Sequence, residues 1–395
     1  MRSSRTRASR AFVAAFVVTS LAGVAAITGA GPSAAAQSPR AALDAALEKF
    51  VAAKGGSPGI AVVVQSGNSP ELHTAGVADV ATGAAITIDD NMRLASVAKA
   101  FSGAAAMALY GDGTFSMTEA ETIGGRLPDM PEAWADITLP QLLQHTSGIP
   151  DFSGSEQFVE AVQAAPTVAP PPEELVGFVA DEPLEFTPGS RYQYSNTDNI
   201  LVALMVEAAS GLPYNDVLAA KVYAPFGLTN TSIPNVMGLP APTMHGYALL
   251  PDGTAEDATE SFNPEWAWAS GGVASTPADA NRFIRGYAAG EETSPMAALA
   301  QFKFRKGSSE PPGPGKQSAG MGIFRYETSC GTVYGHTGNT AGYTQFVAAT
   351  RDGQRSVTVS ISAQITPKSD PVRFKDLRRI FGLGVCAALE GAESS

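Results

Sequence analysis

The chain has 395 residues, of which 44% are hydrophobic and 16% are charged, and its formal net charge is −12. This length and composition are those of a globular protein with a large core, and they exclude a disordered or fibrous chain. The excess of acidic residues would repel nucleic acid, so no nucleic-acid partner is expected.

The first 36 residues differ in character from the rest of the chain. Four arginines precede an apolar run from Ala11 to Gly29, and three alanines close the segment at 34–36. This order is typical of an export signal removed after Ala36. A membrane anchor is the alternative, because about 18 apolar residues can span a bilayer. Cleavage predicts a secreted, extracellular protein of residues 37–395 with no stable membrane anchor. Its net charge would be −16, because the remaining chain has 22 basic and 38 acidic residues.

Residue periodicity predicts the secondary structure of the remaining chain. Helical spacing of apolar residues opens it, two β-branched runs follow, and a second helical segment ends at Gly111. The middle is mostly helical, and strand patterns return after about residue 318, where Asp352-Gly353 indicates a tight hairpin. In order, the expected elements are a helix at 40–53, strands at 59–67 and 71–80, a helix at 97–110, strands after 318, and a last helix at about 370–389.

These elements predict an α/β (α+β) fold in which an antiparallel β-sheet is flanked by helices and an all-helical subdomain is added. Strands from the two ends of the chain would join in one sheet. The α/β part would comprise about 41–110 and 318–390, and the mostly helical part about 111–317. A cleft is expected between the two parts.

The stretch RLASVAKAF places Ser96 and Lys99 three positions apart at the start of a predicted helix. An N-cap serine followed by a surface lysine would explain this spacing. Positions i and i+3 are also neighbours on a helix, so Lys99 could instead reach the Ser96 hydroxyl and activate it as a nucleophile.

Two later motifs supply partners that a serine nucleophile needs. Tyr194 and Asn196 lie in a turn before a helix, where Ser195 or Thr197 could simply cap that helix. His336, Thr337 and Gly338 follow an apolar strand, in which a lone histidine is more often structural than catalytic. Together, S-x-x-K, Y-x-N and H-T-G in this order form a specific pattern.

This pattern resembles the penicillin-recognising serine hydrolases, which include class C β-lactamases and secreted D-alanyl-D-alanine carboxypeptidases. The resemblance extends over about residues 41–389 and is strongest to the secreted Streptomyces carboxypeptidases. It implies a β-lactamase/transpeptidase-like fold. The family's β-lactamases usually have lysine where this chain has His336, which favours a peptidase. Arg325 is the basic residue available in the segment where relatives contribute one to the cleft.

The resemblance also implies a role for each motif residue. Ser96 would attack a peptide or lactam carbonyl, and Lys99 and Tyr194 would share the removal of its proton. Backbone N–H groups of Ser96 and Asn339 would stabilise the oxyanion. The remaining expected substrate ligands are Asn196 for the amide, and His336 and Thr337 for the terminal carboxylate, with Gly338 giving the ligand close access to the backbone.

Two cysteines, Cys330 and Cys386, complete the set of candidate residues. Export would place them in an oxidising compartment, so a disulfide between them is expected, and two inert buried thiols are the alternative. The four histidines show no ligand spacing, so neither a metal nor another cofactor is expected.

The expected function is therefore a secreted, penicillin-binding carboxypeptidase that cleaves acyl-D-Ala-D-Ala peptides through an acyl-enzyme on Ser96. Its partners would be cell-wall peptides or β-lactams, and the chain would be a monomer. A class C-like β-lactamase, an esterase or a D-aminopeptidase would use the same scaffold. A non-catalytic penicillin or peptidoglycan binder is the non-enzyme alternative.

Overall fold

The computed structural model describes residues 38–291, 293–305 and 310–391. The predicted export signal therefore lies outside the described residues. Within these ranges, no helix combines the length and apolar character that crossing a bilayer requires.

A seven-stranded antiparallel sheet forms the centre of the fold, in the order β2-β1-β11-β10-β9-β8-β7. Ile60 of β1 lies opposite Ile361 of β11, so the first and last strands pair directly, as the sequence predicts. Gly353 has a positive φ of 66° in the turn between β10 and β11. The strands are β1 (Gly59–Ser66), β2 (Pro70–Gly76), β7 (Lys316–Ala319), β8 (Phe324–Thr328), β9 (Gly331–Thr340), β10 (Tyr343–Ala349) and β11 (Arg355–Ile361).

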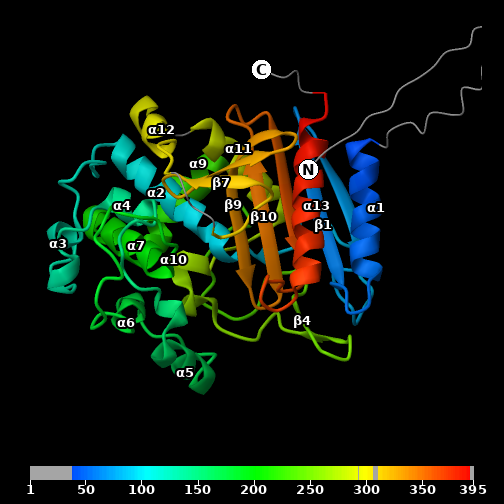
Figure 1. Ribbon diagram of the computed structural model, residues 1–395, viewed down its shortest axis with the longest axis horizontal. Coiled ribbons are helices and arrows are strands. Elements are labelled where there is room, and N and C mark those ends of the chain that lie inside the picture. The colour runs from blue at the N-terminus through cyan, green and yellow to red at the C-terminus, as the bar shows by residue number, and fades with distance from the viewer. Residues whose placement is uncertain (1–37, 292, 306–309, 392–395) are drawn as a thin grey trace, which may run out of the picture. The chain divides into compact units, whose positions relative to one another are not determined.

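Helices α1 (Pro39–Ala52) and α13 (Pro371–Leu389) lie side by side against one face of the sheet (Figure 1). Their apolar side chains pack in one cluster with Val62, Phe346 and Val357 from the strands. The neighbouring residue of β10, Val347, packs into the core on the opposite face, because successive strand residues point to opposite faces.

The core on that opposite face is larger and is formed mainly by helices. Phe101 and Phe283 stack in it with ring centroids 3.8 Å apart. The long helices here are α2 (Ala98–Gly111), α7 (Asn196–Ser210) and α11 (Pro277–Ala289). The shorter α-helices are α3 (Ile123–Arg126), α4 (Leu139–Leu143), α5 (Glu156–Ala164), α6 (Pro172–Gly177), α8 (Tyr214–Leu218), α9 (Ala224–Phe226), α10 (Trp268–Gly271) and α12 (Pro295–Gln301).

Two small sheets in or beside the middle of the chain were not predicted. One pairs β3 (Met92–Arg93) with β6 (Ala274–Ser275), and the other pairs β4 (Tyr247–Leu249) with β5 (Ala255–Asp257). Strands of two or three residues are too short to produce an alternating sequence pattern. The first of them fixes the backbone just before Ser96.

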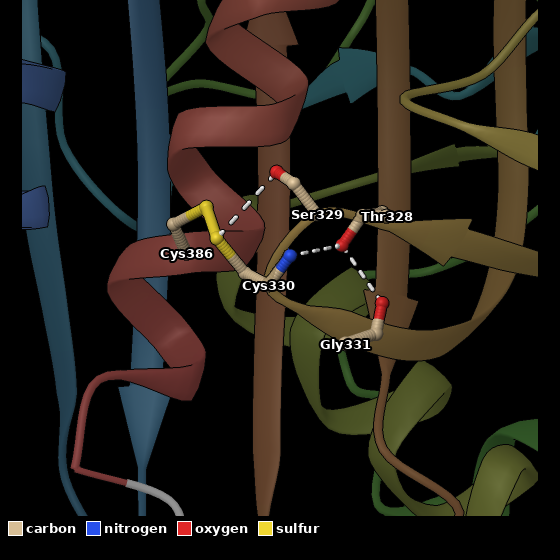
Figure 2. The surroundings of a disulfide bond; sticks show 5 residues. All are labelled: Thr328, Ser329, Cys330, Gly331 and Cys386. Atoms are coloured by element: carbon tan, nitrogen blue, oxygen red, sulfur yellow. Dashed lines mark hydrogen bonds between the residues drawn. A yellow bond between two sulfur atoms is a disulfide. The ribbon is translucent and has the colours of Figure 1, made fainter. Parts of the chain in front are cut away.

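A disulfide joins Cys330 to Cys386, as expected (Figure 2). Cys330 lies in the turn between β8 and β9, and Cys386 lies in the last part of α13. The disulfide therefore ties a turn of the sheet to the helix that covers it, with 56 residues separating the two cysteines.

Candidate active site

Ser96 lies in a short 3-10 turn, η1 (Ala95–Val97), immediately before α2. Ala95 has a positive φ of 51°, a left-handed conformation that is unfavourable for a residue with a side chain. Ser96 is partly exposed, and the N-cap of α2 is Val97, with no side-chain capping bond. Interpreting Ser96 as a helix-capping serine is therefore wrong.

Lys99 is fully buried, and its ammonium nitrogen makes three hydrogen bonds. Nζ donates to Ser96 Oγ at 3.2 Å, to Asn196 Oδ1 at 2.7 Å and to the Ser270 carbonyl at 2.7 Å. Burial lowers the pKa of Lys99 to about 7, against the opposing charges of Asp151 and Asp198. A large share of Lys99 is therefore the neutral amine at neutral pH.

Tyr194 precedes α7 and completes the surroundings of Lys99. Its ring centroid lies 4.9 Å from Lys99 Nζ, and its buried hydroxyl has no hydrogen-bond partner of normal geometry in the described chain. Burial raises the pKa of Tyr194 well above its ordinary value, and the nearby Ser96 hydroxyl opposes this shift only in part. In the free protein Tyr194 is therefore a neutral phenol.

His145 packs against the ring of Tyr194. The two ring centroids are 4.5 Å apart, and His145 Nδ1 lies 2.9 Å from Asp198 Oδ2. Burial lowers the pKa of His145 to about 3, and the nearby Lys99 charge adds to this effect. His145 is therefore neutral under ordinary conditions.

Asn196 is the first residue of α7, and both ends of its amide are engaged. The oxygen accepts the bond from Lys99, while Nδ2 donates to the Asp151 carboxylate at 3.0 and 3.2 Å and to Ser153 Oγ at 2.9 Å. The amide N–H groups are thus occupied within the protein. The expectation that Asn196 binds the substrate amide stays a prediction.

The third motif lies on β9, which runs beside η1. Thr337 Oγ1 and His336 Nε2 are both buried without a hydrogen-bond partner in the described chain. His336 Nδ1 lies 2.5 Å from the Thr337 carbonyl, so a neutral ring would donate there and leave Nε2 as an acceptor. Burial lowers the pKa of His336 to about 3, with Lys99 adding to the shift. An unprotonated Nε2 is a poor ligand for the carboxylate that His336 was expected to bind.

The packing of the protein requires a glycine at position 338. A Cβ at this position would lie 2.2 Å from the Leu94 carbonyl and 3.2 Å from the Ala95 Cβ. The absence of a side chain therefore lets β9 approach the segment that carries Ser96. Hydrogen bonds within the protein hold the Asn339 side chain, because Nδ2 donates to Thr344 Oγ1 and the Ile365 carbonyl.

Two cavities meet at Ser96. They have volumes of about 410 and 320 Å³ and share Ser96, Asn196 and Asn339 as lining residues. The first is rich in aromatic side chains, and the second is lined by Tyr194, Thr337 and Gly338. No lysine or arginine is among the described residues that line either cavity. The aromatic residues of the first cavity are Phe152, Phe158, Phe262 and Trp266.

Arg325 does not line either of these cavities. Its guanidinium pairs with Glu327 at 3.1 Å and lies 5.3 Å from the centre of the Phe304 ring. His336 does not line them either. The structure thus brings Ser96, Lys99, Tyr194 and Asn196 together, with Thr337, Gly338 and Asn339 beside them. His336 is buried and is not among the described residues that line the two cavities.

The sequence motifs do not identify two residues that form hydrogen bonds at the centre of the site. Asp151 binds the Asn196 amide, and the Ser270 carbonyl binds Lys99. Ser270 acts through its backbone, which any residue type would offer, so no sequence pattern could identify it. Asp151 is a lone carboxylate beside a proline, and its partner lies 45 residues later in the chain.

Comparison with known proteins identifies the family of the chain. The β-lactamase family profile matches residues 43–380. AmpH of Escherichia coli, a D-alanyl-D-alanine-carboxypeptidase/endopeptidase, is 28% identical over 59% of this chain and 58% of its own length. Penicillin-binding protein 4* of Bacillus subtilis is 27% identical over 45% of this chain and 38% of its own length. The matches thus span only about two fifths to three fifths of these curated relatives.

Solved structures show the same fold over most of the chain. A D-stereospecific amidohydrolase from Streptomyces has a TM-score of 0.72 and 27% identity, covering 82% of this chain and 94% of its own. A D-amino acid amidase from Ochrobactrum anthropi, complexed with L-phenylalanine amide, has a TM-score of 0.76 and 23% identity, covering 88% of this chain and 98% of its own, and supports the fold alone.

The fold and the matched length define a protein of the β-lactamase/transpeptidase class. The chain belongs to the β-lactamase family, and its relatives here include a D-alanyl-D-alanine-carboxypeptidase/endopeptidase, a penicillin-binding protein and a D-stereospecific amidohydrolase. The particular likeness to secreted Streptomyces carboxypeptidases stays a prediction. The monomeric state does too, since one structural neighbour is an octameric homologue from Pyrococcus abyssi.

Proposed function

We propose that the protein is an exported serine-type D-alanyl-D-alanine carboxypeptidase that acts on acyl-D-Ala-D-Ala peptides through an acyl-enzyme on Ser96. The observation that carries this proposal is the hydrogen bond from the buried Lys99 Nζ to Ser96 Oγ at 3.2 Å. A buried amine beside a cleft hydroxyl is the pairing of base and nucleophile that acyl transfer needs.

In the proposed acylation, Ser96 Oγ attacks the carbonyl carbon of the scissile amide. Neutral Lys99 accepts the hydrogen bond from the Ser96 hydroxyl, the reverse of the donation made by the ammonium form, and takes the serine proton. Its pKa of about 7 leaves much of it uncharged, whereas burial disfavours the Tyr194 phenolate. The N–H groups of Ser96 and Asn339 would stabilise the oxyanion, where losing one such donor costs about 3 kcal/mol in other enzymes. The C–N bond then breaks, and the leaving amine takes a proton through Tyr194.

Deacylation reverses these roles, with water in place of the serine hydroxyl. Neutral Lys99 accepts a proton from water, whose oxygen attacks the ester carbon. The ester C–O bond then breaks, Ser96 Oγ takes the proton back from Lys99, and the acid is released. The two cavities that share Ser96 leave room for the acyl part and the leaving part of a substrate. Asn196, with its N–H groups occupied, would position Lys99 rather than the substrate.

A D-amino-acid amidase is the second candidate, and a specific observation favours it. The described residues lining the two cavities include no cation that would bind a substrate carboxylate, and the unprotonated Nε2 of His336 would not attract one. An amide leaving group needs no such partner. A class C-like β-lactamase, an esterase and a non-catalytic penicillin or peptidoglycan binder are distinguished by the assay below.

The test compares Ser96→Ala with Ser329→Ala, a control at an exposed serine in the turn beside the disulfide. Purified variants are assayed for D-alanine release from an acyl-D-Ala-D-Ala peptide, for hydrolysis of D-alanine amide and an ester, and for penicillin turnover. Ser96→Ala is expected to lose all turnover while the control keeps it. Turnover by Ser96→Ala would contradict the proposed nucleophile. The substrate that the unmodified protein cleaves fastest decides between carboxypeptidase, amidase, esterase and β-lactamase.

A further inference from the structure

The orientation of the Asn196 amide is fixed by the charges on either side of it. Its oxygen faces the Lys99 ammonium at 2.7 Å, and its nitrogen faces the Asp151 carboxylate at 3.0 Å. The opposite orientation would place the amide oxygen against the Asp151 carboxylate, and two acceptors cannot form a hydrogen bond. It would also place the NH₂ group against Lys99, which cannot accept a hydrogen bond while it is an ammonium. Asp151 is therefore the group that determines which end of the amide Lys99 meets.

Asp151 is itself held in place by the backbone that follows it. It caps the 3-10 turn η3 (Phe152–Gly154), and its Oδ1 accepts from the Ser153 N–H at 3.0 Å and from the Ser153 hydroxyl at 2.9 Å. The same Ser153 hydroxyl accepts from Asn196 Nδ2 at 2.9 Å. The carboxylate, the hydroxyl and the amide thus form a closed network beside Ser96.

We propose that Asp151 is a positioning residue that holds the Asn196 amide so that its oxygen receives Lys99, and thereby directs Lys99 Nζ to Ser96. This inference rests on the proposed role of Ser96 and Lys99. Without Asp151 the amide could rotate and present its NH₂ group to Lys99, which would displace the base from the nucleophile. A displacement of about 1 Å can reduce the rate about 100-fold.

The Asp151 charge also acts on Lys99 directly. The charged and titratable groups around Lys99 are Asp151, Asp198, His145, His336 and Tyr194, of which the two aspartates raise the pKa of Lys99. Removing the Asp151 charge should therefore lower that pKa further. The acid limb of activity would then move to lower pH, because the neutral amine would persist there.

Two substitutions separate the hydrogen bond of Asp151 from its charge. Asp151→Asn keeps an acceptor oxygen for Asn196 without the charge, and Asp151→Ala removes both. Asp151→Ala is expected to lower kcat about 100-fold with KM within about threefold of the unmodified enzyme. Asp151→Asn should keep kcat within about tenfold above pH 8, and its acid limb should lie at lower pH.

The assay follows hydrolysis of the D-Ala-D-Ala peptide or of D-alanine amide, whichever the enzyme cleaves faster, from pH 5 to 9. The matched control is Asp112→Asn, since Asp112 also accepts bonds from the turn that follows it but contacts Lys221 rather than the site. This control should behave as the unmodified enzyme. Unchanged kcat in Asp151→Ala, or an equal loss in both Asp151 variants with no shift of the acid limb, would overturn the proposal.

Exchanging the side chains of Asp151 and Asn196 gives an independent test. Asn196→Asp alone places two carboxylates together and should reduce activity strongly. In the double variant Asp151→Asn/Asn196→Asp, the new amide can donate to the new carboxylate, which still faces Lys99. A carboxylate in contact with Lys99 also raises the pKa of Lys99, so the comparison is made at pH 9, where activity should recover at least tenfold over Asn196→Asp. No recovery would overturn the inference. If Ser96→Ala were active, the proposed function would fail instead, so the two failures are distinguishable.

Discussion

The central residue of the site is a lysine whose burial makes it a base. Lys99 is enclosed by the protein, and burial lowers its pKa to about 7, while the two nearby histidines have pKa values of about 3 and remain neutral above pH 5. At this site the chemistry depends on the removal of water around one side chain rather than on an unusual residue type.

A pH profile tests this account of Lys99. As the pH falls through about 7, Lys99 gains a proton and can no longer accept one from Ser96, so acylation is expected to fall about tenfold per pH unit below that point. Lys99→Arg, which stays charged, should lose acylation at every pH. Initial rates between pH 5 and 9 measure both effects. A flat profile in this range, or an active Lys99→Arg, would show that Lys99 is not the base.

At the scale of elements, the site depends on the close approach of β9 to the turn that carries Ser96. Gly338→Ala would place a Cβ 2.2 Å from the Leu94 carbonyl, so one of the two segments must move. We expect kcat/KM to fall about 100-fold and the free energy of unfolding to fall by about 1–3 kcal/mol.

The matched control for this change is Gly382→Ala, in the middle of α13. A Cβ there would meet nothing within 4 Å, so stability should stay the same or rise by up to about 1 kcal/mol. Urea unfolding and hydrolysis rates measure both variants. Full activity in Gly338→Ala would refute the argument that this glycine sets the distance between β9 and η1.

The disulfide also acts between elements, because it joins α13 to the turn between β8 and β9. Replacing both cysteines in Cys330→Ser/Cys386→Ser should lower the free energy of unfolding by ~4 kcal/mol on the chain-entropy argument for a loop of 56 residues. Activity at 25 °C should persist, since neither cysteine lines the cavities at Ser96. Denaturation with and without a reducing agent measures this, and equal stability of the two forms would contradict it.

For the whole molecule, the order of helices and strands could be predicted from the sequence, whereas contacts between distant loops could not. The alternating residues of β1, β10 and β11 and the Asp352-Gly353 turn predicted one antiparallel sheet, and this prediction is confirmed. Motif spacing identified residues that the fold brings together around Lys99. The hydrogen bonds of the Asn196 amide and the burial of His336 depend on residues from other segments of the chain. A local sequence pattern therefore cannot predict them.

The acidic character of the molecule leads to a prediction about substrates. A net charge of −12 for the chain, or −16 without its first 36 residues, would repel a peptide that ends in a free carboxylate. Raising the salt from 10 to 200 mM should therefore raise kcat/KM for acyl-D-Ala-D-Ala by roughly two- to fivefold, because salt screens the repulsion. The same peptide with an amidated C-terminus should respond much less, and an equal response of both peptides would contradict this.

The measurement that tests the central claim most directly is the location of the acyl group. The protein is incubated with fluorescent penicillin, digested, and its labelled peptide is sequenced by mass spectrometry, with a peptide ester as a second acylating agent. The account predicts an acyl adduct on Ser96 with both reagents and none in Ser96→Ala. An adduct on another residue that forms and decays at the rate of turnover would contradict it.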